Sequence, residues 1–215
     1  MIFQSRYEAW SYLWILLKNK IFDFSDTVIL WILRGGSIIA QQLSLELGIC
    51  VNFVIIKSLY YDGKKIWAVV QNWLTIYNKK LIWKLWLSEE EVEDIRKKAF
   101  EEAKDERERF WLKNYDFTWK QVVIVDDWVK TWFTAVAAAK FAKQSWARRI
   151  IFAFPVIRDK ALAWIKNFFD EIIFPEVSDD SNFNLHKYYM SYYSLNSEEV
   201  MEVIQKLKQS NCFIG

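Results

Sequence analysis

Two neighbouring carboxylates, Asp126 and Asp127, come directly after the apolar run of residues 121–125. Such a run is typical of a strand that is buried on both faces of a parallel sheet, and α/β sheets bind ligands at the carboxyl ends of their strands. The hydroxyl groups of Thr131 and Thr134 follow where a helix is expected to begin. Because the N-terminus of a helix attracts phosphate, the segment predicts a site for a phosphorylated ligand. Standing alone, two aspartates after a strand would more simply cap a helix.

The turn between these aspartates and the helix contains tryptophan where a phosphate site needs glycine. Glycine lets a backbone close on a phosphate group, whereas the indoles of Trp128 and Trp132 are expected to fill that site. The whole chain shows the same imbalance, with 5 glycines and 13 tryptophans in 215 residues. Average usage predicts about 15 glycines in a chain of this length, and the two counts together come to 18.

Several other tryptophans lie where glycine is expected. Trp73 follows Asn72 as in an Asn-Gly turn, Trp146 lies at the end of a predicted helix, and Trp119 comes just before an apolar strand. We therefore hypothesise that many or all of the tryptophans are encoded by UGA codons that are read as glycine in the cell, as in some bacterial lineages. A protein that is genuinely rich in tryptophan is the alternative, and the codons at these positions distinguish the two.

Segments with strand and helix patterns alternate along the chain. Predicted strands cover residues 27–33, 51–57, 121–125, 149–154 and 171–174, and residues 66–70 with 74–77 predict a hairpin. Predicted helices cover residues 5–19, 37–47, 88–110, 134–144, 159–169 and 197–209. The order predicts an α/β fold with a mainly parallel sheet flanked by helices, in a single domain over residues 1–215.

The segment around the two aspartates resembles a known family signature. With glycine at positions 128 and 132, residues 122–135 become VVIVDDGVKTGFTA. This resembles the phosphoribosyl diphosphate signature of type I phosphoribosyltransferases, whose α/β fold carries a small hood. The resemblance implies that Asp126 and Asp127 bind the ribose hydroxyls and Mg²⁺, and that both serve ligand binding rather than packing. It assigns substrate binding to the following loop, which consists of Trp128, Val129, Lys130, Thr131, Trp132, Phe133 and Thr134.

A second segment resembles the pyrophosphate loop of the same family, in which a short turn after a core strand presents backbone N–H groups to the diphosphate. Here the turn is Arg34-Gly35-Gly36. The resemblance assigns charge pairing with the diphosphate to Arg34 and Lys57. Leu33 departs from the pattern, because similar members have proline before the arginine. Residues 66–73, the helix that ends near Glu108-Arg109, and residues 183–200 also resemble a subgroup of predicted phosphoribosyltransferases.

The resemblance implies a Mg²⁺-dependent transfer of ribose 5-phosphate from phosphoribosyl diphosphate to a nitrogen acceptor, such as a nucleobase, with release of diphosphate. Phe183 and the tyrosines up to Tyr193 either stack on a flat base or pack against the last helix. A non-catalytic regulator that binds phosphoribosyl diphosphate is an alternative within the same fold. A structural or interaction protein with real tryptophans and an inactive site is another.

Composition limits the partners. The formal net charge of +2 argues against a nucleic-acid-binding surface, and no apolar run reaches the roughly 18 residues that a membrane span needs. The two cysteines, Cys50 and Cys212, give no disulfide framework, so a reducing, cytoplasmic location is expected. The expected partners are phosphoribosyl diphosphate and a small-molecule acceptor, and a homodimer is possible.

Overall fold

The computed structural model describes every residue except 1, 22, 63, 113–115, 181–182 and 215. Five parallel strands form a central sheet in the order β2-β1-β6-β7-β9. They are β1 (Thr27–Ile32), β2 (Val51–Val54), β6 (Gln121–Val125), β7 (Arg149–Ala153) and β9 (Glu171–Ile173). The predicted α/β class with a mainly parallel sheet is therefore confirmed.

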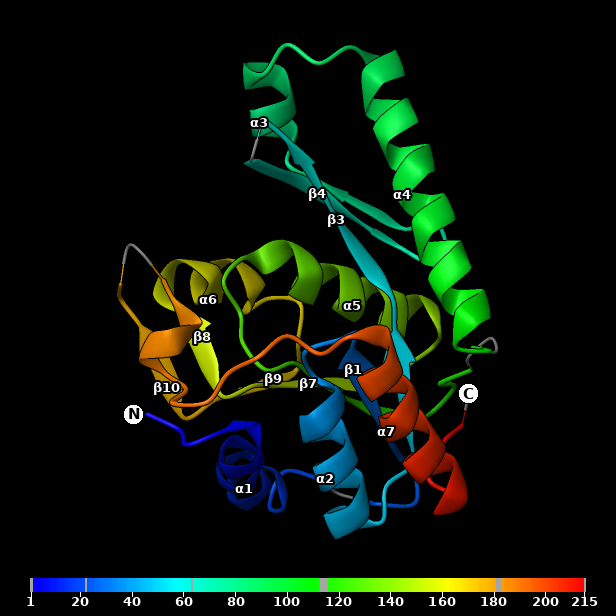
Figure 1. Cartoon of the computed structure of the whole chain (residues 1–215), viewed down its shortest axis with the longest axis vertical. Helices are drawn as coiled ribbons and strands as arrows, with labels where there is room; N and C mark the ends of the chain where they lie inside the picture. Colours follow the sequence, from blue (N-terminus) through cyan, green and yellow to red (C-terminus); the bar gives the residue numbers. More distant parts are fainter. Residues whose placement is uncertain (1, 22, 63, 113–115, 181–182, 215) are drawn as a thin grey trace.

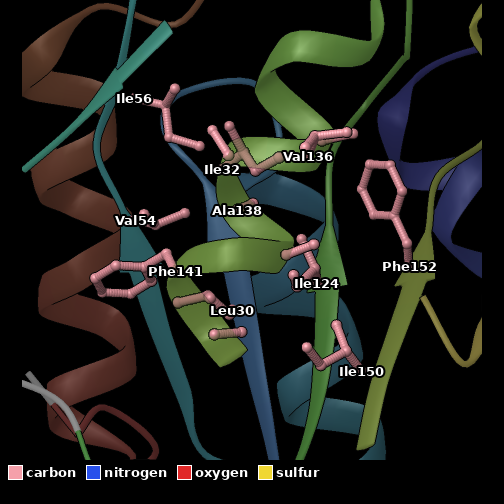
Figure 2. Close-up of a cluster of buried hydrophobic side chains, with 14 of the residues drawn as sticks. Leu30, Ile32, Val54, Ile56, Ile124, Val136, Ala138, Phe141, Ile150 and Phe152 are labelled. Atoms are coloured by element: carbon pink, nitrogen blue, oxygen red, sulfur yellow. The ribbon is translucent and has the colours of Figure 1, made fainter. Parts of the chain in front are cut away.

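Helices cover both faces of this sheet (Figure 1). One face carries α1 (Arg6–Leu17), α2 (Ser37–Leu47) and α7 (Ser197–Gln209), and the other carries α5 (Trp132–Gln144) and α6 (Asp159–Ile165). Every residue of β1 and β6 is buried, because alternate side chains enter the two cores. Figure 2 shows Leu30 and Ile124 on the face that packs against Val136 and Phe141 of α5.

A second group of elements projects from this body and forms an arm (Figure 1). Its antiparallel sheet consists of β3 (Ile56–Tyr61), β4 (Lys64–Val70) and β5 (Thr75–Tyr77), and its helices are α3 (Lys79–Lys84) and α4 (Glu89–Arg109). Ser88 and Glu91 form a capping box at the start of α4, which covers most of the helix predicted at residues 88–110. Two short parallel strands, β8 (Val156–Arg158) and β10 (Glu176–Ser178), and a 3-10 turn at Leu185–Lys187 complete the described elements.

The predicted strand at residues 51–57 is in fact two strands that belong to different sheets. β2 pairs with β1 in the body, whereas β3 pairs with β4 in the arm. Between them the N–H of Ile55 donates to the side-chain oxygen of Gln71 at 2.8 Å. The sequence of residues 51–57 shows one continuous apolar run, so it does not reveal that the strand changes its pairing partner. The hydrogen bond at the point of change comes from Gln71, which lies outside this run. The predicted strand at residues 149–154 corresponds to β7 alone, and β8 follows it outside the predicted range.

Tryptophan dominates the unusual backbone conformations. Seven of the described residues other than glycine have a positive φ, and five of these are tryptophans with φ between 52° and 67°. The five are Trp73, Trp86, Trp111, Trp119 and Trp146. A left-handed conformation costs a residue with a Cβ roughly 1–2 kcal/mol, and glycine avoids this cost. The expectation that Trp73, Trp119 and Trp146 lie at positions suited to glycine is met by their backbone.

Three helices end in one hydrogen-bonded motif with a tryptophan at its left-handed position. After α5, the N–H of Trp146 donates to the carbonyl of Lys143 and the N–H of Ala147 to that of Ala142, both at 3.1 Å. After α3 and α4, the N–H groups of Trp86 and Trp111, and of the residue that follows each, donate hydrogen bonds in the same pattern. This Schellman motif favours glycine or asparagine at that position. Asparagine occupies the same position after α7, and the pattern supports the recoding hypothesis.

Trp31 differs from this group, because it lies within β1 and is fully buried. Its ring stacks on Phe53 at a centroid distance of 5.1 Å. The indole Nε1 has no hydrogen-bond partner among the described residues, and an unpaired buried donor of this kind costs about 1–3 kcal/mol.

Candidate functional site

The first cavity, called the β6 cavity below, lies beside the carboxyl end of β6 and has a volume of about 500 Å³. It is lined by Ser58, Tyr60, Lys65, Asp126, Trp128, Val129, Lys130, Thr131, Thr134, Ala135 and Phe152. The N-cap of α5 is Thr131, whose side chain makes no capping hydrogen bond. Neither aspartate caps this helix, so the simple capping alternative does not describe the pair.

The half-buried carboxyl group of Asp126 faces this cavity together with an unexpected lysine. Lys65 reaches over from β4, and its Nζ donates to Oγ1 of Thr134 at 2.9 Å. Burial lowers the pKa of Lys65 to about 8, although the charge of Asp126 opposes this shift. Burial and the neighbouring Asp127 carboxylate raise the pKa of Asp126 well above its usual range. A bound cation or hydroxyl donor would therefore stabilise the charged form of Asp126, which burial and the neighbouring carboxylate disfavour.

Asp127 has a different environment and is not among the residues that line the β6 cavity. Its Oδ2 lies 2.9 Å from Nη2 of Arg6 and accepts a hydrogen bond from the hydroxyl of Tyr192 at 3.1 Å. Arg6 and Asp127 are only 3% and 1% exposed. A buried ion pair therefore joins Asp127 to α1, so Asp127 also has a structural role that the sequence did not predict. Its contact with a ligand stays a prediction.

A second cavity, called the β1 cavity, lies at the turn after β1 and has a volume of about 350 Å³. It is lined by Arg6, Leu33, Arg34, Gly35, Ile56, Lys57, Glu106, Tyr192, Ser194 and Leu195. The structure thus brings together Arg34 and Lys57, the two cations that were assigned to the diphosphate. Both pair with Glu106 of α4, whose carboxylate oxygens lie 2.8 Å from Arg34 Nη2 and 2.7 Å from Lys57 Nζ.

Gly35 and Gly36 allow the turns after β1 and β6 to approach each other closely. A Cβ on Gly35 would lie 2.2 Å from Oδ1 of Asp127, and one on Gly36 would lie 2.6 Å from the carbonyl oxygen of Val125. Such distances leave no room for a side chain. The two cavities therefore lie at the carboxyl ends of β1 and β6, which are neighbouring strands.

The remaining predicted loop residues divide between the cavity and the core. Val129 and Phe133 are buried, and Lys130 is exposed at the rim. The expectation that two indoles fill the site holds only for Trp128, which lines the β6 cavity and stacks on Phe183 with centroids 5.4 Å apart. Trp132 stacks instead on Phe133 and Trp164. Neither Trp128 nor Trp132 has a positive φ, so a left-handed backbone gives no reason for glycine at either position.

The sequence matches the family model of the phosphoribosyl transferase domain over residues 10–184. This range contains the glycine-bearing turn after β1 and the loop after β6. The chain belongs to this family. The type I phosphoribosyltransferase fold that the two sequence segments predict is thereby confirmed. No curated protein sequence gives a significant match.

Solved structures share the architecture of this phosphoribosyl transferase domain. The protein TT1426 from Thermus thermophilus is 22% identical with a TM-score of 0.79, and the alignment covers 96% of this chain and 99% of that one. The purine phosphoribosyltransferase from Pyrococcus horikoshii is 17% identical with a TM-score of 0.50, over 92% of this chain and 97% of that one. At these identities the likeness concerns the fold alone.

Sequence reasoning missed three residues that line the two cavities, namely Arg6, Lys65 and Glu106. Each belongs to an element whose local pattern is explained without a site: the N-terminal helix, a strand and a charged helix. A partial signal existed for Glu106, because it is a charged residue spaced by helical turns from the buried Ala99 and Ala103. For Lys65 the sequence carried no signal.

The residues of the β6 cavity fit a Mg²⁺ ion that is held jointly with a substrate. Mg²⁺ is commonly bound by one or two carboxylates together with substrate phosphates, and Asp126 supplies one carboxylate at the cavity wall. Within the described part of the chain, no group of three or more His, Cys, Asp or Glu side chains could hold a metal ion. Across the same residues, no helix combines the length and the apolar character needed to cross a membrane.

Proposed function

We propose that the chain transfers the phosphoribosyl group of phosphoribosyl diphosphate to a nitrogen acceptor and releases diphosphate. The observation that carries this proposal is the pair of adjoining cavities. One combines Asp126 with the N-terminus of α5, and the other contains Arg34 and Lys57. Their chemistry suits the two ends of this substrate, a ribose 5-phosphate and a diphosphate, and the family match supports the assignment.

In this proposal the β6 cavity binds the part of the substrate that is transferred. The free N–H groups at the start of α5 and the hydroxyls of Thr131 and Thr134 bind the 5-phosphate, and Lys65 adds a positive charge beside Thr134. Asp126 accepts hydrogen bonds from the ribose hydroxyls. Because the sugar is held at both ends, its anomeric carbon is oriented toward the acceptor.

The β1 cavity stabilises the leaving group. The bond between the anomeric carbon and the diphosphate oxygen breaks, and negative charge develops on that oxygen. Arg34, Lys57 and the backbone of the turn at Gly35 and Gly36 stabilise this charge. When bound, Mg²⁺ supplies further charge neutralisation on the diphosphate.

Phe183 supports a planar base as the acceptor. Its ring is buried and lies nearly parallel to the indole of Trp128, with an interplanar angle of 11°. With glycine at position 128, this ring face would be open toward the β6 cavity, and aromatic rings commonly stack on planar groups.

The test is an assay of diphosphate release with phosphoribosyl diphosphate, Mg²⁺ and each common nucleobase. It uses the Trp128→Gly variant and, as a control, the same variant that also carries Asp126→Asn. Release that depends on one base and on Asp126 would support the proposal. Binding of phosphoribosyl diphosphate without release for any base would indicate the regulator instead. If the glycine variant neither binds nor reacts, the proposal is wrong.

The two aspartates are expected to differ when each is replaced by asparagine. Asp126→Asn should lower kcat/KM about 10- to 100-fold, since hydrogen bonds to a charged group contribute about 1.5–3 kcal/mol, and the free energy of unfolding should not fall. Asp127→Asn should lower the free energy of unfolding by about 3 kcal/mol, because it leaves Arg6 buried without its charge partner. Urea unfolding and the release assay measure both effects, and near-normal activity of Asp126→Asn would refute the site.

Binding of ribose 5-phosphate is expected to weaken as the pH rises above about 8, where Lys65 loses its charge. Below that pH the lysine is protonated and pairs with the phosphate. Calorimetric titrations of the Trp128→Gly protein between pH 7 and 10 measure the slope of the ribose 5-phosphate affinity against pH. Adding Lys65→Arg should keep binding at high pH, and adding Lys65→Met should weaken it at every pH. The exposed Lys140 on α5 provides the control variant Lys140→Met. A slope that persists in Lys65→Met would contradict the assignment.

A further inference from the structure

Glu106 occupies a position that the proposed diphosphate site does not explain. It lies near the end of α4, and its side chain is 8% exposed. One carboxylate oxygen contacts Arg34 from the body and the other contacts Lys57 on β3. A single carboxylate thus engages both cations that are assigned to the diphosphate.

The charges around the β1 cavity make this contact unusual. Among the described residues that line the cavity, Glu106 carries the only carboxylate. Arg6, the third cation of the lining, already pairs with Asp127. Burial raises the pKa of Glu106, but hydrogen bonds from Lys57 and Arg34 outweigh burial and lower the pKa below its usual value. Glu106 is therefore held as an anion by the same groups that would hold a diphosphate oxygen.

We propose that the carboxylate of Glu106 takes the place of diphosphate oxygens on Arg34 and Lys57 and is displaced when diphosphate binds. This inference rests on the proposed function, because it assigns the β1 cavity to diphosphate. The contact keeps the two cations in position between turnovers, and it also competes with the ligand. Glu106 is thus a positioning residue that lowers the affinity for diphosphate, which favours release of this product.

The contact also connects the site to the arm. α4 packs on β3 and β4, and its contact with Arg34 ties the helix to the turn after β1. When diphosphate takes Arg34 and Lys57, the last turns of α4 lose two ion pairs. Local opening of a helix end becomes more frequent when its stabilising contacts are removed.

The test is calorimetric titration with inorganic diphosphate in the presence of Mg²⁺. Diphosphate is a suitable probe because no tryptophan is among the described residues that line the β1 cavity. Glu106→Gln keeps the size of the side chain and removes its charge, and it should bind diphosphate about 10-fold more tightly than the unchanged chain. Glu102→Gln is the matched control, because Glu102 lies one turn earlier on α4 and is exposed. It should leave the affinity unchanged.

The outcomes separate this inference from the proposed function. Diphosphate binding by the unchanged chain, with equal or weaker binding by Glu106→Gln, would overturn the competing role alone. If neither protein binds diphosphate, the assignment of the cavity and the proposed function both fall.

Hydrogen exchange of the unchanged chain gives a second measurement that needs no variant. Diphosphate should accelerate amide exchange in the last turns of α4. Unchanged or slower exchange there, with diphosphate bound, would contradict displacement.

Discussion

Replacing the five left-handed tryptophans by glycine is expected to raise the free energy of unfolding by about 3–5 kcal/mol. Each of these residues has a φ between 52° and 67°, which costs a residue with a Cβ roughly 1–2 kcal/mol. Glycine removes this cost but loses more conformational entropy on folding, by about 0.5–1 kcal/mol. Trp119 and Trp146 flank the antiparallel bridge between Thr118 and Ala147, so their effects are coupled, whereas the effects at the other three sites should add.

The five tryptophans differ in the side-chain contacts that replacement by glycine would remove. Trp86, Trp111, Trp119 and Trp146 are 66–85% exposed, so their indoles gain little from burial. Trp73 stacks on Phe100 with centroids 3.8 Å apart, and the guanidinium of Arg96 lies 4.8 Å from its ring. Its replacement should therefore contribute least, and Trp146→Gly should contribute about 1 kcal/mol, because the Schellman motif stays intact.

Urea unfolding of single variants measures these effects. Trp146→Gly should be more stable than Trp146→Ala by about 1 kcal/mol, because alanine keeps the Cβ that a positive φ disfavours. Trp164 is the matched control, since it is 60% exposed but lies within the right-handed helix α6. Trp164→Gly should lower the stability by about 1–2 kcal/mol, because glycine is unfavourable in a helix and the stacking on Trp132 is lost. Equal stability of Trp146→Gly and Trp146→Ala would contradict the backbone argument, and UGG codons at these positions would refute recoding.

Trp128→Gly is expected to increase the affinity for phosphoribosyl diphosphate about 100-fold. Binding to the chain as written requires the indole to leave the β6 cavity and its stacking partner Phe183. Loss of that stacking costs about 0.5–1.5 kcal/mol, and exposure of the apolar ring costs about 1.5–3 kcal/mol. A total of about 2–4.5 kcal/mol corresponds to a factor between about 30 and 2,000 in the dissociation constant.

Trp132→Gly provides the comparison for this experiment. Its indole stacks on Phe133 and Trp164, away from the residues that line the cavity, so its removal should change the affinity little. Calorimetric titration with Mg²⁺ present measures the unchanged chain and both variants. Tight binding by the unchanged chain, equal to that of Trp128→Gly, would mean that the tryptophan is tolerated in the site. The recoding argument would then fail at this position.

The sequence by itself was sufficient for the core of the fold and for one segment of the site. The apolar runs of β1 and β6 predict strands that are buried on both faces, and Ser88 with Glu91 predicts the start of α4. The passage from β6 through Asp126 to the N-terminus of α5 is also contained in one short stretch. These features depend on neighbouring residues, through side-chain periodicity and local hydrogen bonds, so a single sequence displays them.

The positions of the five tryptophans with positive φ could be expected from the sequence only in part. Trp73, Trp119 and Trp146 could be expected from turn and helix-end patterns, whereas Trp86 and Trp111 required the observed ends of α3 and α4. Helix ends are set partly by packing, so local sequence places them less securely than helix interiors.

Only the tertiary structure decided which side chains meet at the site. Asp127 is separated from Arg6 by 121 positions, Glu106 from Arg34 by 72 and Thr134 from Lys65 by 69. Two adjacent aspartates therefore received different environments, one at the cavity wall and one in a buried ion pair. No local pattern distinguishes them, because the partner of each carboxylate is determined by how α1, the arm and the sheet pack together in space.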